Sequence, residues 1–434
     1  MGSLPDGSTS SGRESTPEPE PLNSNSAFLH LWAGETASQI GFQVAALATS
    51  AMAITILHAS TDEVGLLNAL QTIAFLLIGL PAGAWVDRWR KRRTMIAADL
   101  VRVAALASVP IADMLGGLTL AHLMVVAAVM GLATVFFDVA YQSYVPVIVG
   151  PTQVGDANGR LEASFQIARI GGPGLGGWLS AVASAPLAYA ATAGAYGFSA
   201  LAVWRISEPE ARPVPLAGTG LWRQIREGLD YVRSEPLLAP LFACISMASF
   251  FMQAQVVLVP VLVLRTLGMS ASTLGGLLSL GAVGGLIGAI ARPRIVRRLG
   301  EGRSIYLCNV IGVVASLGLP LSARAGSLAA AVIVAASVVG SFFLTIYNVT
   351  QMSLRQRLCP PELLGRLNAT FRFAVWGMMP LGSLACGALA ERMGVEAAMY
   401  VFTAGALVAG GLMALTPAAR LGGDGDGARA RALP

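Results

Sequence analysis

Long apolar segments separated by short polar ones run through most of the chain. Each segment has about 18 to 30 residues, which at 1.5 Å per residue is enough to cross the hydrocarbon core of a bilayer as a helix. We predict twelve spans, over residues 28–57, 64–86, 94–115, 118–145, 161–183, 187–206, 238–264, 273–291, 304–321, 328–347, 363–389 and 397–415. The pattern therefore predicts an all-α integral membrane protein with twelve transmembrane helices.

Three polar stretches divide this pattern. Residues 1–27 are rich in Ser, Pro, Gly and Glu, and we expect a disordered cytoplasmic tail. Residues 207–236 form a linker in which 221–233 carry one apolar helical stripe, which favours an interfacial amphipathic helix over a mobile linker. The predicted units are thus two six-helix halves, 28–206 and 237–415, with a second cytoplasmic tail at 416–434.

Composition supports a membrane protein and argues against most enzymes. The 434 residues are 55% hydrophobic and 12% charged, with a mean hydropathy of +0.65. The three histidines are far apart and the cysteines form no C-x-x-C pair, so we expect no metal site. The single lysine, Lys91, is followed by Arg92, which excludes a P-loop. We expect no cofactor and no enzymatic activity, and we predict a monomer in the lipid bilayer.

The basic residues predict an orientation. Only Arg265, Arg324 and Arg392 fall in loops after odd-numbered spans, and most of the 29 basic residues fall in the tails and the other loops. The positive-inside rule then places both termini in the cytoplasm, with the chain in the inner membrane. The net charge of +5 reflects this topology, and we expect no nucleic-acid partner.

An internal repeat relates the two halves. At an offset of 206 residues Tyr141 matches Tyr347, residues 159–161 match 365–367, and Arg88 matches Arg294. Parallel duplications of this kind are typical of transporters whose substrate site lies between the halves.

The loop after the second span resembles the signature G-x-x-x-D-R-x-G-R-[RK] of the major facilitator superfamily. Gly83, Asp87, Arg88, Lys91 and Arg92 fall on matching positions. The resemblance implies the major facilitator fold and a loop that latches one conformation. The alternative is a plain positively charged loop.

Two further features of this loop matter. Arg90 stands where the family signature has its second glycine, so the turn can differ in shape. Gly79 and Gly83 form a small-x-x-x-small face, from which we predict a close helix contact.

The fifth span contains a glycine motif, with Gly172, Pro173, Gly176 and Gly177 at its defining positions. It resembles the G-P-x-x-G-G motif of drug:proton antiporters in the same superfamily. Gly172 and Gly176 lie on one helical face and would allow close contact with a neighbouring span. The alternative is a packing site of no special function.

Wider stretches, including residues 64–67, 136–146 and 157–160, resemble the macrolide and enterobactin exporters of the superfamily. The resemblance implies efflux of a small amphipathic molecule, such as an antibiotic or siderophore, driven by the proton gradient. An importer and a non-transporting membrane sensor or partner stay as alternatives.

Ionisable side chains inside spans are costly and are therefore functional candidates. They are Glu35, Asp99, Arg102, Asp138, Arg169 and Arg372. Apolar surroundings favour a protonated carboxyl and a nearby arginine favours the charged one, so movement of an arginine can load and release a proton. We predict that Asp138 couples with Arg169 or Arg102 and that Glu35 is a second proton site. Static ion pairing is the alternative, above all for Asp99 with Arg102.

The repeat assigns the proton chemistry to the first half, because the 206-residue offset maps Asp138 to Leu344 and Arg169 to Val375. The second half would then mainly contribute binding surface for the cargo. Candidate cavity residues are Gln39, Gln43, Tyr141, Gln142, Gln253, Gln255, Tyr347, Asn348, Arg372, Phe373 and Trp376.

Overall fold

Helices build the whole of the described chain. The computed structural model describes residues 21–86, 88–150, 153–182, 184–207, 230, 233–235, 238–358 and 364–416, and no strand occurs among them. The first group of helices is α1 (Ser26–Ala51), α2 (Thr61–Val86), α3 (Lys91–Met114), α4 (Leu120–Val149), α5 (Val154–Val182) and α6 (Ala185–Trp204). The second group is α8 (Leu238–Val261), α9 (Ala271–Leu299), α10 (Glu301–Ala315), α11 (Gly318–Leu321), α12 (Ala329–Leu358), α13 (Leu364–Met393) and α14 (Val395–Ala414).

Short helical pieces complete the list. π-helical turns, Met52–Ile56 and Leu262–Thr266, continue α1 and α8, and two 3-10 turns, Ser322–Arg324 and Gly326–Leu328, follow α11. Residues 1–20 of the predicted tail lie outside the described residues, and Ser26 and Ala27 of that tail belong to α1. Most of the predicted linker helix, nearly all of the C-terminal tail and Asp87 also lie outside the described residues.

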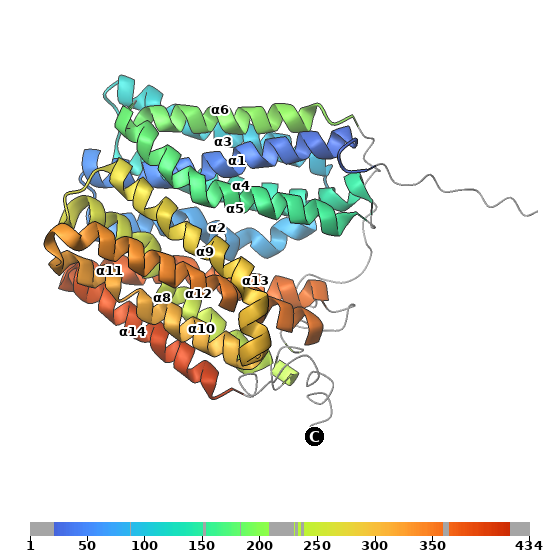
Figure 1. Cartoon of the computed structure of the whole chain (residues 1–434). Coiled ribbons are helices and arrows are strands. Elements are labelled where there is room, and N and C mark those ends of the chain that lie inside the picture. Colours follow the sequence, from blue (N-terminus) through green and yellow to red (C-terminus); the bar gives the residue numbers. More distant parts are fainter. Residues whose placement is uncertain are drawn as a thin grey trace, which may run out of the picture.

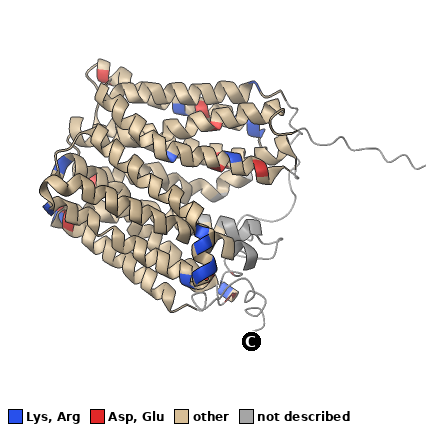
Figure 2. Cartoon of the chain, in the orientation of Figure 1, with Lys and Arg blue, Asp and Glu red and all other residues tan. Residues whose placement is uncertain are grey.

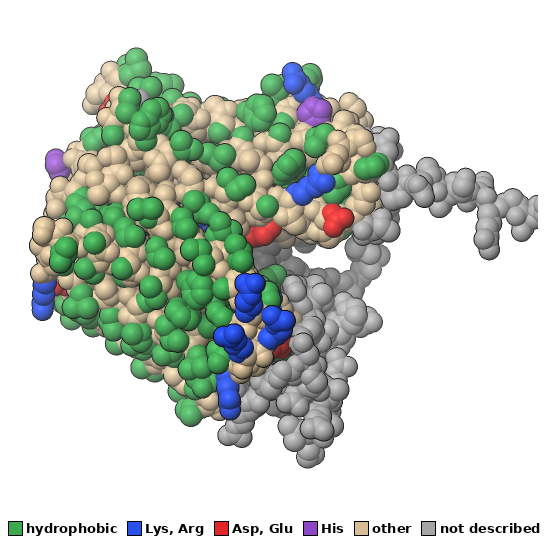
Figure 3. Space-filling model, in the orientation of Figure 1, with side chains coloured by type: hydrophobic (Ala, Val, Ile, Leu, Met, Phe, Trp, Pro, Cys, Tyr) green, Lys and Arg blue, Asp and Glu red, His purple; other side chains and the backbone are tan. Residues whose placement is uncertain are grey.

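The described helices suit a membrane. Ten of them are long and apolar enough to span a bilayer, and α5 and α6 fall outside that group. Large hydrophobic side chains such as Leu286, Ile287 and Ile290 are exposed on α9, where only lipid can cover them favourably. Figures 2 and 3 show charged residues mainly toward the two ends of the bundle and apolar side chains over the face between. The prediction of an all-helical, multi-pass membrane protein is confirmed.

Several helices are longer than the apolar segments that predict them. α4 continues to Val149, α9 to Leu299 and α12 to Leu358. The extensions of α9 and α12 carry polar and basic residues. A helix tolerates them because it satisfies its backbone hydrogen bonds internally whether lipid or water surrounds it. Hydropathy therefore locates the helices and underestimates their length.

Helix boundaries recur along the chain, at a spacing that differs from the predicted one. The π-helical turns, α2 with α9, α3 with α10, and α6 with α14 all begin 210 residues apart. The offset of 206 is therefore wrong for these elements. The error is four residues, close to one helical turn, so a slipped alignment keeps apolar positions on the same face.

The two groups of helices lie side by side in Figure 1, and their main contacts join α2 to α13 and α5 to α9. We call the end of the bundle where α1 begins the tail end. The opposite end, where α1 meets the loop before α2, is the far end.

Glycines allow both of these helix pairs to approach closely near the far end. A Cβ on Gly65 of α2 would lie 3.0 Å from the Cα of Gly387 on α13. A Cβ on Gly177 of α5 would lie 3.1 Å from the Cα of Gly275 on α9. The two crossings are equivalent at the 210-residue spacing, and they bring the groups into backbone contact at this end.

Candidate functional site

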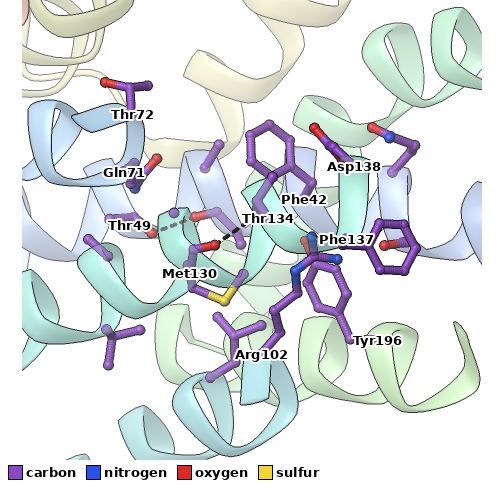
Figure 4. A pocket seen from close by; sticks show the side chains of 18 of the residues that line it. Phe42, Thr49, Gln71, Thr72, Arg102, Met130, Thr134, Phe137, Asp138 and Tyr196 are labelled. Carbon is purple, nitrogen blue, oxygen red and sulfur yellow. Dashed lines mark hydrogen bonds between the residues drawn. The ribbon is translucent and has the colours of Figure 1, made fainter. Parts of the chain in front are cut away.

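The first cavity, here called the acid cavity, has a volume of about 440 Å³. Glu35 of α1 and Asp138 of α4 line it together with Arg102 of α3, and Figure 4 shows its wall. Most of the remaining lining is apolar or aromatic and comes from the first group, while Trp376 and Met379 come from α13. The structure thus gathers three of the four predicted proton-coupling residues around one mainly apolar space.

Arg102 is held on one wall of this cavity. Its Nη1 lies 3.0 Å from Asp99 Oδ1, one turn earlier on α3, and both side chains are almost completely buried. The guanidinium also lies 4.5 Å from the ring centre of Phe137 and 5.0 Å from that of Tyr196. Asp99 and Arg102 therefore neutralise each other, and the two rings add cation–π stabilisation.

Glu35 has a different environment. Its Oε1 accepts a hydrogen bond of 2.6 Å from Gln39, on the next turn of α1. Its Oε2 is buried, and no group in the described part of the chain donates to it. A charged carboxylate oxygen in such a place loses its hydration without compensation, whereas a neutral carboxyl loses less.

The 210-residue spacing gives one buried acid a neutral counterpart in the second group. Asp99 of α3 corresponds to Asn309 of α10, because these two helices begin 210 residues apart. Asn309 is buried, and a side chain added at Gly410 of α14 would meet its Oδ1. The acid is thus matched by an amide of nearly the same size.

The second cavity, here called the arginine cavity, lies between the two groups and has a volume of about 380 Å³. Arg169 of α5 lines it, with Gln43 of α1 and Gln255 of α8. Asp138 lines the acid cavity and not the arginine cavity, so the predicted partners Asp138 and Arg169 face different cavities. Gln71 of α2 lines both cavities and marks their boundary.

The predicted cavity residues divide into several environments. Gln39 and Trp376 line the acid cavity, and Gln43 and Gln255 line the arginine cavity. The other described candidates line neither cavity: they are Tyr141, Gln142, Gln253, Tyr347, Asn348 and Phe373. The side chain of Arg372 lies outside the described residues.

Two of these residues are buried where helices pack together. Gln253 is buried and donates a hydrogen bond of 2.9 Å to Ser383 Oγ on α13. Tyr347 is buried in an apolar cluster of the second group. Both are polar side chains in spans that serve helix packing.

The predicted latch is only partly visible. Among the described residues none from another element lies within 4 Å of a Cβ added at Gly79 or Gly83, so the described part of the chain does not show the predicted close contact there; α2 is crowded at Gly65. Arg92 donates from Nε to the Val203 carbonyl oxygen at 3.1 Å, and its Nη2 donates to the carbonyl of Trp204. Arg92 thus binds the C-terminal carbonyls of α6, where a cation is electrostatically favoured. Asp87 lies outside the described residues.

The glycine motif does bring helices together, as predicted. A Cβ on Gly172 would lie 2.4 Å from Cβ of Gln43, and one on Gly176 would lie 3.1 Å from Cα of Val44, both on α1. Pro173 lies inside α5, and its carbonyl oxygen would be 2.3 Å from a Cβ on Gly275. One face of the motif therefore packs on α1 and the other forms the far-end crossing with α9.

Hydrogen bonds reinforce the closed far end. Arg265, in the π-helical turn after α8, donates to Thr61 Oγ1 at 3.3 Å and to the carbonyl of Ala59. Glu391 of α13 accepts from the Thr61 N–H at 3.1 Å, at the N-terminus of α2 where a carboxylate is favoured. These bonds join the two groups of helices at their far ends.

Sequence reasoning missed the aromatic wall of the acid cavity. Phe42, Phe75, Phe137, Tyr189 and Tyr196 all line it, although they look like ordinary apolar span residues in the sequence. Phe75 contacts Trp376 edge to face across the two groups, with ring centres 4.1 Å apart. Only the three-dimensional arrangement distinguishes these rings from lipid-facing ones.

Comparisons with known proteins agree with this architecture. The sequence pattern of the Major Facilitator Superfamily matches residues 31–383. The multidrug efflux pump Tap of Mycolicibacterium fortuitum is 28% identical over 362 residues, covering 80% of this chain and 86% of that protein. The Tap pump of Mycobacterium tuberculosis is 26% identical over 368 residues, covering 82% and 85%.

Solved structures show the same fold at lower identity. A bacterial homologue of the iron transporter ferroportin, in an inward-facing state, has a TM-score of 0.71 at 17% identity and covers 89% of this chain and 97% of its own. The nucleoside transporter NupG, as a D323A mutant, also has a TM-score of 0.71, at 12% identity, and covers 90% and 99%.

Proposed function

Because the chain belongs to the major facilitator superfamily, whose members are transporters and not enzymes, we propose that it exports small amphipathic molecules in exchange for protons. The similarity to Tap multidrug efflux pumps supports export. The observation that carries the proposal is the acid cavity, in which Glu35 and Asp138 line an apolar, aromatic space of about 440 Å³. Such a space suits an amphipathic cargo and makes carboxyl groups sensitive to what binds beside them.

We propose a twelve-span arrangement in two six-helix repeats related by 210 residues, with α5 and α6 among the spans. Both are long enough, with 29 and 20 residues, and both pack within the bundle against α1. We further propose that the tail end faces the cytoplasm, as the distribution of basic residues indicates. The closed far end then makes this an inward-facing state.

Transport follows as alternating access. Cargo enters from the tail end, the two groups rock, and the far-end crossings separate to release it outside. Protons that enter from outside neutralise Glu35 and Asp138 and allow the return. Arg102 does not have to move in this scheme, because Asp99 already pairs with it.

The experiment is transport of a fluorescent amphipathic dye in inside-out vesicles that hold the purified protein and a proton gradient. We expect dye to accumulate inside, and accumulation to stop when an uncoupler dissipates the gradient. Movement in the opposite direction would indicate uptake, and accumulation insensitive to the uncoupler would contradict proton coupling.

Loss of the Arg265 hydrogen bonds should favour opening of the far end. Replacing Arg265 by Gln removes hydrogen bonds between the two groups of helices. Together these bonds contribute about 1 kcal/mol or more, so their loss should raise the equilibrium constant for opening of the far end roughly fivefold. The measurement is labelling of a cysteine at Gln255 by a membrane-impermeant maleimide applied outside cells, in a background without native cysteines. We expect labelling to be about fivefold faster.

The matched control is Arg324→Gln. Arg324 is an exposed arginine paired with Glu396 of the same group, at 3.3 Å. Its loss should leave the labelling rate unchanged. Equal rates in both variants would mean that Arg265 does not hold the far end closed.

A further inference from the structure

The two cavities differ in charge. Glu35 and Asp138 line the acid cavity, whereas Arg169 is the one charged residue among the described residues that line the arginine cavity. We infer that the arginine cavity is a binding subsite for an oxyanion, such as the carboxylate of an amphipathic cargo, held by Arg169 with Gln43 and Gln71. The inference rests on the proposed transport function only in calling this ligand the cargo.

Arg169 is available for a ligand. In the part of the chain that the structure describes it forms no ion pair or hydrogen bond, and its side chain is exposed on a cavity wall. Arg102 differs, because its guanidinium already pairs with Asp99 and contacts two aromatic rings. A guanidinium facing a cavity of limited water content gains much from a carboxylate, since its planar fork can donate two parallel hydrogen bonds.

Amide donors surround Arg169 for a structural reason. Gly172, one turn along α5, has no side chain, so α1 comes close enough to place Gln43 beside that turn. Gln71 faces the same cavity from α2. The side-chain amides of Gln43 and Gln71 have no hydrogen-bond partner among the described residues, which leaves them free to donate to the same ligand.

The boundary between the cavities fixes how such a cargo would lie. Ala46 and Gln71 line both cavities, so the two spaces adjoin. An anionic group would be repelled by Glu35 and Asp138 and attracted by Arg169, while the aromatic wall would hold an apolar body. Arg169 has no charged counterpart at the 210-residue spacing, because the equivalent residue is Met379, which lines the acid cavity.

The test is equilibrium binding in nanodiscs, without a gradient. The probes are N-dansyl-leucine and its primary amide, which differ only in the carboxylate and whose fluorescence rises in apolar surroundings. We expect the protein to bind the carboxylate roughly tenfold more tightly than the amide, as a charge-assisted hydrogen bond predicts. Arg169→Gln should remove this preference and bind the amide as before, and Arg169→Lys should restore part of it.

The matched control is Arg160→Gln, an equal charge change on the same helix at a residue that lines neither cavity. It should keep the preference. The inference is overturned if the wild-type protein shows no preference, or if Arg169→Gln keeps it. Unchanged binding of the amide by Arg169→Gln shows that this variant is folded.

A phospholipid headgroup presents the same chemistry, and a second set of nanodiscs distinguishes it. Adding phosphatidylglycerol to phosphatidylcholine discs should leave N-dansyl-leucine binding unchanged if the ligand is a soluble cargo. Weaker binding that depends on Arg169 would support the oxyanion site with lipid as its occupant. Because binding needs no transport, a protein that binds the carboxylate and exports nothing would contradict the proposed function alone.

Discussion

Glu35→Gln and Asp138→Asn will each abolish uphill export while leaving downhill movement of the cargo intact. Both residues line the acid cavity, and each substitution replaces a carboxyl, the group proposed to carry the proton, by an amide of almost the same volume. Moving one proton through about 100 mV contributes about 2.3 kcal/mol, which corresponds to roughly 50-fold in a cargo gradient. The measurement is the steady-state dye gradient in energised vesicles, compared with dye equilibration without a gradient.

The controls change the same groups elsewhere. Glu162→Gln on α5 and Asp113→Asn at the end of α3 replace exposed acids that line neither cavity. Both should keep the full gradient. A full gradient in Glu35→Gln and in Asp138→Asn would show that the proton is carried elsewhere, and loss of downhill movement would indicate a binding defect.

Gly177→Ala will separate the far ends of α5 and α9. The added Cβ would lie 2.7 Å from the carbonyl oxygen of Ala271 and 3.0 Å from Cα of Ser272, and backbone atoms cannot yield without movement of the whole helix. Overpacking of this kind costs about 1–3 kcal/mol. We expect a lower melting temperature, loss of export, and a longer distance between spin labels at Asp62 and Ser272, which are exposed on opposite groups.

A neighbouring glycine supplies the control. A Cβ at Gly171, six residues earlier in α5, would have no described atom of another element within 4 Å, so an alanine there meets none of the described residues. Gly171→Ala should keep the label distance and the export activity, and its stability should not fall, because alanine is the better helix former. If both alanines behave alike, backbone contact at the crossing does not close the far end.

The arrangement of spans could be predicted well from the sequence, because each apolar segment must become a helix in lipid. The offset between the two halves is harder to predict. Gly-Arg-Leu at 159–161 and 365–367 supports an offset of 206, and a helical sequence tolerates a shift of about one turn. The two π-helical turns, which no side-chain match reveals, lie 210 residues apart.

The candidate site could be predicted only in part. Charged residues are conspicuous in a span, so the sequence predicts Glu35, Asp138 and Arg102 as functional, and the structure places all three around one cavity. The sequence could not assign partners, because charged residues in neighbouring spans can face different cavities, as Arg169 and Asp138 do. The predicted close contact at Gly79 and Gly83 has no partner among the described residues, since a small-residue face needs a partner helix that the sequence does not specify.

The exchange of Asp99 in the first group for Asn309 in the second has an energetic consequence. An amide and a carboxyl have nearly the same shape, so the two groups of helices can pack alike while only one of them carries a buried charge at this position. A single atom then decides whether the position needs a partner such as Arg102. A bundle of this kind can gain or lose a buried charge by point substitution without repacking its helices.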